Sequence, residues 1–253
     1  MAAPHPTYPN PTIVQVTCEI AFSPQTDNRL SAGTLYPIFA AEFPEIAPIG
    51  IGTIQFVLGP QPFAPAAPEQ PQNATAFRFS TQTGSRFVQV SQSGFIYQTA
   101  EPYKGWADFS AKLLELWEKS AAVLRPGPVV KVGLRYINKI PKSEDHPHAV
   151  EWLRVTPDIP EALLTSKEHF LGRIESSPAP AHLRLVTVLN ALPTPDSPAG
   201  AIVFDIDRLS TEQFEVSTPA ISEKLEALHD DVWNAFSAAS TDLLKTHLSG
   251  KNK

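Results

Sequence analysis

The chain has 253 residues, of which 42% are hydrophobic and 18% charged, a composition typical of a folded protein with a substantial core. Its net charge of −6 is spread out, with 7 Lys and Arg against 9 Asp and Glu in residues 1–128 and 13 against 17 in the remainder. The lack of a basic excess argues against duplex nucleic acid as a partner, and the lone Cys18 excludes an internal disulfide framework and a zinc site built on several thiolates.

The first stretch, MAAPHPTYPNP, has neither the basic nor the apolar region of a secretion signal. No apolar run approaches the ~20 residues that a membrane span requires. Together with the single cysteine, these features lead us to expect a cytoplasmic protein without membrane contact. Residues 1–11 and 249–253 are expected to be flexible ends.

Residues 12–128 are predicted to form a first α+β unit. TIVQVTCEIAF alternates in hydrophobicity and predicts a strand that buries Val14, Val16, Cys18, Ile20 and Phe22. SAGTLYPIFAAEF predicts a short helix, with Ser31 as its cap and Pro44 as its end. IGTIQFVLG predicts a further strand, and the proline-rich residues 59–73 predict a loop without regular structure.

Residues 75–99 then predict two or three strands, with turns at Thr83-Gly84 and Ser93-Gly94. The last element of the first unit is a long amphipathic helix, because apolar side chains recur at three- and four-residue spacing from Trp106 to Leu124.

Residues 129–248 are predicted to form a second α+β unit with the same order of elements. It begins with the strand VVKVGLRYINKI and continues with a helix at about 158–170. Strands follow at FLGRIES, AHLRLVTVLNAL and GAIVFDIDRL. A single helix from about Ile221 to Leu248 ends the unit, since it places apolar residues on one stripe.

The similar order of the two units predicts an internal duplication. An offset of 116 residues matches Val14 with Val130 and Trp117 with Trp233, and an offset of 106 matches FRFS at 77–80 with LRLV at 183–186. We therefore predict an α+β protein made by tandem duplication of a β-α-β-β-β-α unit. The two units would form one curved, eight-stranded antiparallel sheet with helices packed on one side, similar in outline to saddle-like and helix-grip-like folds.

The strand VVKVGLRYINKI carries polar residues that need an explanation. Arg135 falls on the face opposite Leu134 and Tyr136, and its counterpart at the offset of 116 is Glu19, which predicts a cross-strand ion pair. Asn138 falls on the apolar face near the strand end, where a polar contact between the units and a ligand contact are both open.

These positions give the candidate binding site for a partner or ligand. We expect the concave middle of the sheet to be lined by Gln15, Glu19, Arg135 and Lys139, and anions to be contacted by Arg78, Arg135 and Arg184. Asn138 completes the set of candidate residues.

Other clusters favour structural roles. EDHPHAVEW could hold a metal through His146 and His148, yet Pro147 and the lack of periodicity predict a solvated loop. Asp205 and Asp207 share one face of a strand without an evident third ligand, and His229 lies near the apolar stripe of the last helix. Cys18 among valines is expected to be inert. We assign no catalytic residue, metal or cofactor.

The same residues carry a family resemblance. The segments VTCEIAF and KVGLRYINKI, the spacing of Tyr103, Trp106 and Phe109, and the pair Leu228-His229 with Phe236 beyond resemble a sporadically distributed family of uncharacterised bacterial proteins of about this length. GLRYIN is the most specific part. The resemblance implies no established activity. The scattered distribution of the family implies an accessory gene, such as a component of a toxin–antitoxin or phage-defence cassette.

Two classes of function follow. The first is a non-catalytic protein-interaction or regulatory module that presents the sheet face, or the groove between the two halves, to a protein or peptide partner. The second is a small-ligand or nucleotide sensor, or an enzyme, that uses the same concavity. The chain has no nucleophile elbow, phosphate-binding glycine loop, zinc-protease motif or dinucleotide fingerprint, which lowers the expectation of an enzyme without excluding one.

Overall fold

A computed structural model describes residues 5–24, 32–49, 76–155, 169–191 and 199–251. Within these residues the protein is α+β, with nine strands in one antiparallel sheet and five helices. The strand order is β2-β3-β4-β5-β1-β6-β9-β8-β7. The predicted class and the antiparallel sheet are thus confirmed, while the sheet has one strand more than the eight expected.

The strands and helices have the following bounds. The strands are β1 (Ile13–Phe22), β2 (Glu45–Ile49), β3 (Ala76–Ser80), β4 (Arg86–Ser91), β5 (Gly94–Thr99), β6 (Val129–Pro141), β7 (Phe170–Ser176), β8 (His182–Ala191) and β9 (Ala201–Ser210). The helices are α1 (Ala32–Phe39), α2 (Trp106–Leu124), α3 (Ala149–Trp152), α4 (Thr218–Ala239) and α5 (Asp242–Leu248).

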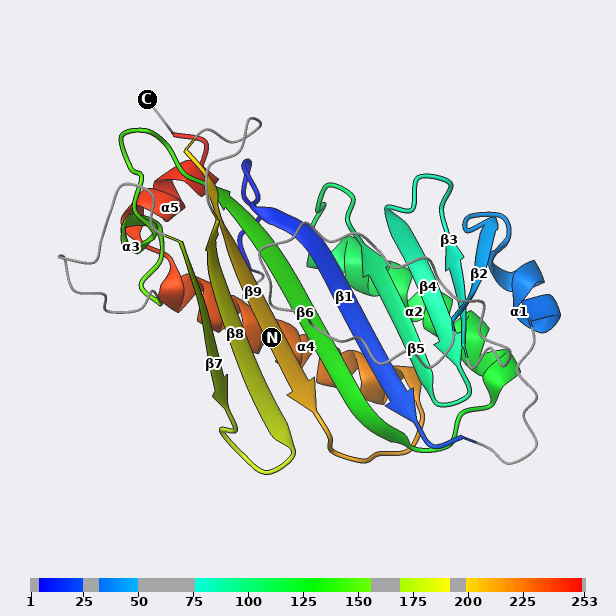
Figure 1. Ribbon diagram of the computed structural model, residues 1–253. Helices are drawn as coiled ribbons and strands as arrows, with labels where there is room; N and C mark the ends of the chain where they lie inside the picture. The colour runs from blue at the N-terminus through cyan, green and yellow to red at the C-terminus, as the bar shows by residue number, and fades with distance from the viewer. Residues whose placement is uncertain (1–4, 25–31, 50–75, 156–168, 192–198, 252–253) are drawn as a thin grey trace.

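Strands β1 and β6 form the centre of the sheet (Figure 1). They run antiparallel, and Cys18 lies opposite Leu134. Outward from β1 the order is β5, β4, β3 and β2, and outward from β6 it is β9, β8 and β7. The two units predicted from the sequence therefore share one continuous sheet, which is joined through their first strands.

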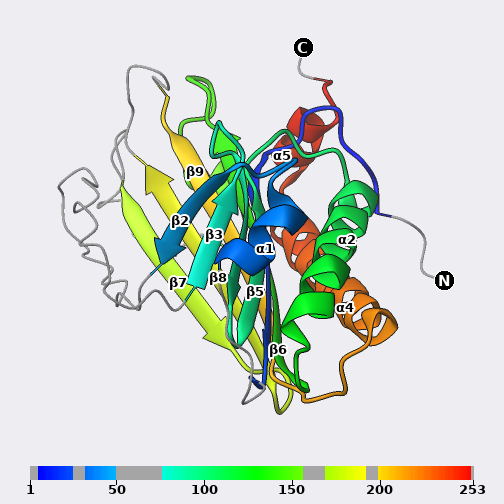
Figure 2. The same ribbon diagram turned by 90° about the vertical axis from the view of Figure 1, so that its right-hand side faces the viewer.

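Helices α2 and α4 lie together on one side of this sheet (Figure 2). The core fills the space between them and the inward-facing side chains of the strands, because residues that alternate along β1, β6 and β9 are buried on that side. Trp117 of α2 is one anchor, since its ring lies 5.9 Å from that of Phe22 and 5.6 Å from that of Phe95. Figure 2 shows that the core is a two-layer packing of sheet and helices.

The prediction that Val14 of β1 is buried is wrong. The pairing of β1 with β6 shifts register between Ile13 and Gln15, so Val14 bulges out and is 42% exposed. Ile13 packs against the core instead. Val16, Cys18, Ile20 and Phe22 are buried as predicted.

The long last helix is also interrupted, contrary to the prediction. Helix α4 ends at Ala239 and α5 begins at Asp242. Ser240 pairs with Leu153 in an isolated bridge, and the Thr241 side chain caps α5 by accepting from the Leu244 N–H. The Thr241 hydroxyl also donates to the Glu151 carbonyl oxygen at 2.6 Å. Ser240 and Thr241 thus contact the α3 region and separate the two helices.

Several predictions fall outside the described residues. These are the Ser31 cap, the strand IGTIQFVLG, the loop at 59–73 and most of the helix at 158–170. The match of FRFS with LRLV does not agree with the sheet, because β3 is the fourth strand on its side of the centre and β8 is the third. Among the described helices, none has the length and apolar character that crossing a membrane would require.

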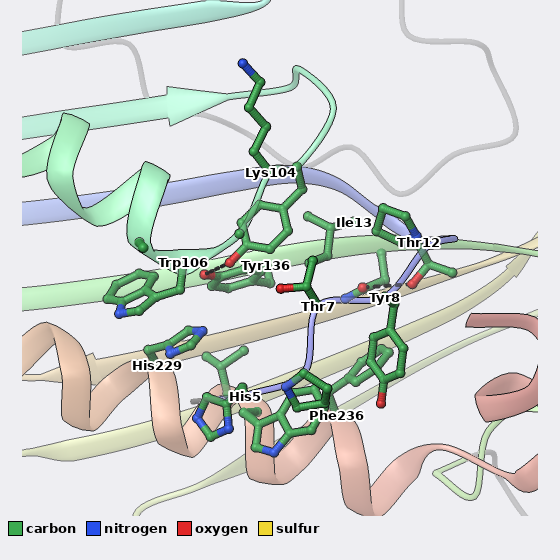
Figure 3. Close-up of a pocket in the computed structure, with 18 of the residues that line it drawn as sticks. His5, Thr7, Tyr8, Thr12, Ile13, Lys104, Trp106, Tyr136, His229 and Phe236 are labelled. Carbon is green, nitrogen blue, oxygen red and sulfur yellow. Dashed lines mark hydrogen bonds between the residues drawn. The ribbon is translucent and has the colours of Figure 1, made fainter. Parts of the chain in front are cut away.

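Residues 5–11, part of the predicted flexible start, lie along the helix side of the sheet (Figure 3). The Asn10 N–H donates to the Leu248 carbonyl oxygen of α5 at 3.1 Å. Tyr8 packs against the core, with its ring 6.1 Å from that of Trp233. This segment therefore connects β1 to the helices α4 and α5.

Candidate functional site

The predicted binding residues are divided between the two faces of the sheet. Strand alternation and register place five of them on the face opposite α2 and α4, namely Gln15, Glu19, Arg78, Arg135 and Lys139. Asn138 and Arg184 lie on the helix face, because Asn138 is buried in the core layer and Arg184 contacts Asp231 of α4. Gln15, Glu19, Arg135 and Lys139 therefore share the open face as predicted, whereas Asn138 and Arg184 lie on the other side of the sheet.

The predicted ion pair between Arg135 and Glu19 is wrong. Since Cys18 faces Leu134 and the strands run antiparallel, the residues that follow each of them move apart, and Arg135 lies opposite Thr17. Arg135 instead makes a two-pronged contact with Asp205 of β9, with its Nε 2.9 Å from Oδ1 and its Nη2 2.5 Å from Oδ2. Glu19 pairs with Lys131 at 2.6 Å.

The other polar residues of the open sheet face are engaged locally. The Gln15 side chain donates to Thr17 and Gln98, and the Arg78 guanidinium donates to Gln89 and lies 4.2 Å from the centre of the Phe87 ring. These contacts occupy separate strands. They make a network of surface pairs, each contributing about 1 kcal/mol or less.

The three arginines expected to share an anion are not close to one another. Arg78 lies on β3, Arg135 on β6 and Arg184 on β8, with Arg184 on the opposite face of the sheet. The Arg184 Nε donates to Asp231 Oδ2 at 2.7 Å, and the buried Arg208 lies 3.0 Å from the same oxygen. Asp231 thus balances charge on the helix face, and the three arginines do not form a shared anion site.

EDHPHAVEW has a structural role at the start of α3. The Glu151 side chain accepts from the His148 N–H at 3.0 Å and lies 2.9 Å from His146 Nδ1, and His148 and Glu151 form a capping box. The Trp152 indole N–H donates to the His146 carbonyl oxygen at 3.0 Å. These contacts give the motif a structural role at the start of α3.

A pocket of about 720 Å³ lies on the helix face, over the seam between the two halves (Figure 3). Residues 5–13, residues 103–108, helix α4 and strands β6 and β9 contribute to it. Its aromatic lining consists of Tyr8, Tyr103, Trp106, Tyr136, Trp233 and Phe236, with His5 and His229 beside them. A pocket of this size and character is typical of sites for small organic ligands.

The floor of the pocket comes from the motif strand β6. The hydroxyls of Tyr136 and Tyr103 lie 3.2 Å apart. Burial raises the pKa of Tyr136, and burial raises the pKa of Tyr103 to about 12, so both hydroxyls stay protonated near neutral pH. Asn138 is held by the Thr12 hydroxyl, which donates to its Oδ1 at 3.1 Å, and by the Phe204 carbonyl oxygen, which accepts from its Nδ2 at 3.2 Å.

One wall of the pocket joins α2 to α4 through stacked rings. Trp106 and His229 are nearly parallel, with centroids 4.2 Å apart and 5° between their planes. The Trp106 indole N–H donates to Glu226 Oε1 at 2.7 Å. Burial lowers the pKa of His229 to about 4, with His5 as a smaller cause, so this imidazole is neutral at pH 7.

The N-terminal segment forms the outer wall. His5 Nε2 lies 2.7 Å from Asp230 Oδ1, and the His5 ring stacks on Trp233 with centroids 4.9 Å apart. Figure 3 shows His5 next to His229, whereas Lys104 extends away from the cluster of rings. The pocket can therefore offer stacking surfaces, neutral hydroxyl and amide groups, and imidazole nitrogens to a bound molecule.

Sequence reasoning found only Asn138 among the pocket residues assigned to a binding site. It treated Trp106 as part of an apolar helix stripe and His229 as a packed histidine, since neither position differs from a core position in spacing. One signal was present, because several of the residues that carry the family resemblance, namely Tyr103, Trp106, Tyr136 and Phe236, line this pocket.

The comparisons with known proteins do not identify the chain. No model of a protein family matches it, and no curated protein matches it in sequence. The resemblance carried by GLRYIN therefore stays a hypothesis.

Asp207 provides a test of the open sheet face through pH. Burial raises the pKa of its carboxyl, opposed by Arg135, with Asp205 and Glu19 raising it further. The folded state therefore holds this proton more tightly than the unfolded chain. The stability that comes from the protonated carboxyl is complete below its ordinary pKa and is lost as the pH rises through the raised value.

We therefore expect Asp207→Asn to raise the free energy of unfolding at pH 7 and to lose that advantage at pH 3, as measured by urea denaturation at several pH values. Glu118→Gln, which removes one negative charge from an exposed position on α2, is the control for the change of charge alone. Equal effects of Asp207→Asn at both pH values would contradict the assigned environment.

Proposed function

We propose that the protein is a ligand-binding module that holds a small, largely aromatic molecule in the pocket between the sheet and helices α2 and α4. The observation that carries this proposal is the convergence of six aromatic side chains from separate parts of the chain on one space of about 720 Å³. A folded chain gains stability by filling such a space with its own side chains, so an aromatic-lined opening favours a bound guest.

The polar groups of the pocket fit this role. Asn138 and Tyr136 are buried, and Tyr136 is paired with the partly buried Tyr103, so these polar groups are at fixed positions and can set the orientation of a ligand. The rings of Trp106 and Trp233 offer flat surfaces for stacking. A non-catalytic sensor or carrier needs no more than these elements.

The test uses the tryptophans themselves. A set of small neutral aromatic compounds and their saturated counterparts of equal size should be compared by thermal shift and by tryptophan fluorescence, because Trp106 and Trp233 lie at the pocket. Aromatic compounds should raise the melting temperature saturably. Trp233→Ala should weaken binding about two- to tenfold, since stacking contributes about 0.5–1.5 kcal/mol.

Tyr36→Ala is the matched control, because Tyr36 is an exposed aromatic residue on α1 that does not line the pocket. Binding should be unchanged in this variant. A screen without any saturable aromatic ligand, or a ligand whose affinity does not respond to Trp233→Ala, would count against the proposal.

A second candidate function, a protein-interaction module, is supported by strand β7. This strand ends the sheet in the described part of the chain and exposes Leu171 and Ile174, which are 50% and 55% accessible. The opposite edge strand, β2, contains Pro48, which cannot donate a ladder hydrogen bond. We propose that an extended segment of a partner protein adds to β7.

Affinity capture from a bacterial lysate tests this second candidate. A stoichiometric partner should be captured by the wild-type protein and lost with the double change Leu171→Lys and Ile174→Lys, while Val150→Lys, at another exposed apolar residue, should retain it. Equal capture by all three proteins would exclude β7 as the binding edge.

We also propose that the two halves arose by duplication, with a likeness to saddle and helix-grip folds in element order only. Two observations support this origin. First, α2 follows β5 and α4 follows β9, and these two strands flank the central pair. Second, the offset of 116 matches Cys18 with Leu134, and these residues face each other as a twofold axis requires. Strand β2 has no counterpart in the described second half. An experimental structure in which the halves do not superpose at this offset would refute it.

A further inference from the structure

At the outer wall of the pocket, three potential metal ligands converge from two distant parts of the chain. They are His5 of the N-terminal segment and the neighbours His229 and Asp230 of α4. One ligand atom from each lies within 4.8 Å of the others. Among the described residues, this is the group of His, Cys, Asp and Glu side chains with the geometry for a shared ion.

His229 presents its ring nitrogens to the pocket. The residue is only 8% exposed and lines the pocket. Among the described residues, the side-chain nitrogen that is both fully buried and without a hydrogen-bond partner is Arg208 Nε, so the His229 nitrogens are not closed off inside the core. Stacking against Trp106 fixes the plane of this ring, and the neutral imidazole is the form that coordinates metal ions.

We propose that His5, His229 and Asp230 bind a divalent transition ion of the zinc class, with the remaining coordination position open to the pocket. Two imidazoles and one carboxylate, with one open position, are a donor set that zinc accepts. Metal–ligand bonds of about 2.0–2.2 Å in a tetrahedron place donor atoms about 3.3–3.6 Å apart. His5, at 2.7 Å from Asp230, lies on a segment outside helices and strands and can adjust to this spacing.

The ion would connect the start of the chain to helix α4 and close the outer wall of the pocket. It would also present a Lewis-acidic position to a bound molecule or a water. The inference does not rest on the proposed organic ligand, because the three residues define the ion site by themselves.

The experiment uses the chain of residues 1–253 without an affinity tag, after chelator treatment and desalting. Calorimetric titration with ZnCl₂ should give one ion per chain, and CoCl₂ should produce the visible absorption bands of a tetrahedral site. His5→Ala and Asp230→Asn should each weaken binding about tenfold or more and remove the cobalt bands. Both residues are partly exposed, at 22% and 48% of their side chains, so the variants should fold.

Two control variants separate this site from other histidine–carboxylate pairs. His146→Ala removes the pair with Glu151, and His182→Ala removes the exposed pair with Glu212. Both should retain full zinc affinity and the cobalt spectrum. The proposal is overturned if the wild-type chain binds no single ion, if His5→Ala and Asp230→Asn bind as well as the wild type, or if His146→Ala or His182→Ala abolishes binding.

Discussion

The antiparallel pairing of β1 with β6 is the constraint on which the rest of the structure depends. These strands begin the two halves of the chain and meet along nearly their full length, with Cys18 opposite Leu134. Each half then adds its strands outward from this centre. Since α2 follows β5 and α4 follows β9, and these strands flank the central pair, both long helices return over the seam on the same face.

The pocket is a consequence of that arrangement. Helices α2 and α4 meet through Trp106, which stacks on His229 and donates to Glu226, and this contact spans the seam above β6. The side chains beneath it include Tyr136 and Asn138 of the motif strand. Because the N-terminal segment precedes β1 directly, it crosses the same region and forms the outer wall of the pocket.

The two faces of β6 explain why GLRYIN combines apolar and polar residues. On the helix face, Leu134 is in the core and Tyr136 and Asn138 form the pocket floor. On the opposite face, Arg135 pairs with Asp205, and a Cβ atom at Gly133 would lie 2.9 Å from Leu209 Cδ2 of the neighbouring strand. One strand thus serves the core, the pocket and the surface network, with each role set by the two-residue alternation.

Local patterns in the sequence determined much of this protein. Hydrophobic alternation located the strands β1, β6, β8 and β9, and helical periodicity located α2 and most of α4, because these signals depend only on which side chains face the core. The same patterns separated Arg135 from Tyr136 correctly by face. What they could not supply was register. A shift of two residues between β1 and β6 would place Glu19 instead of Thr17 opposite Arg135, and it would leave the alternation unchanged. The pairing with Asp205 depends on β9 lying on the other side of β6.

The pocket was decided by tertiary structure for the same reason. His5, Trp106 and His229 are separated by more than a hundred residues, and each is unremarkable within its own segment. Only the docking of α2 against α4 and the course of the N-terminal segment bring them together. Sequence periodicity indicates which side of a helix or strand is apolar. A pocket forms where the side chains of packed elements do not fill the space between them. Whether they fill it depends on the side-chain volumes and the positions of elements that are distant in the chain.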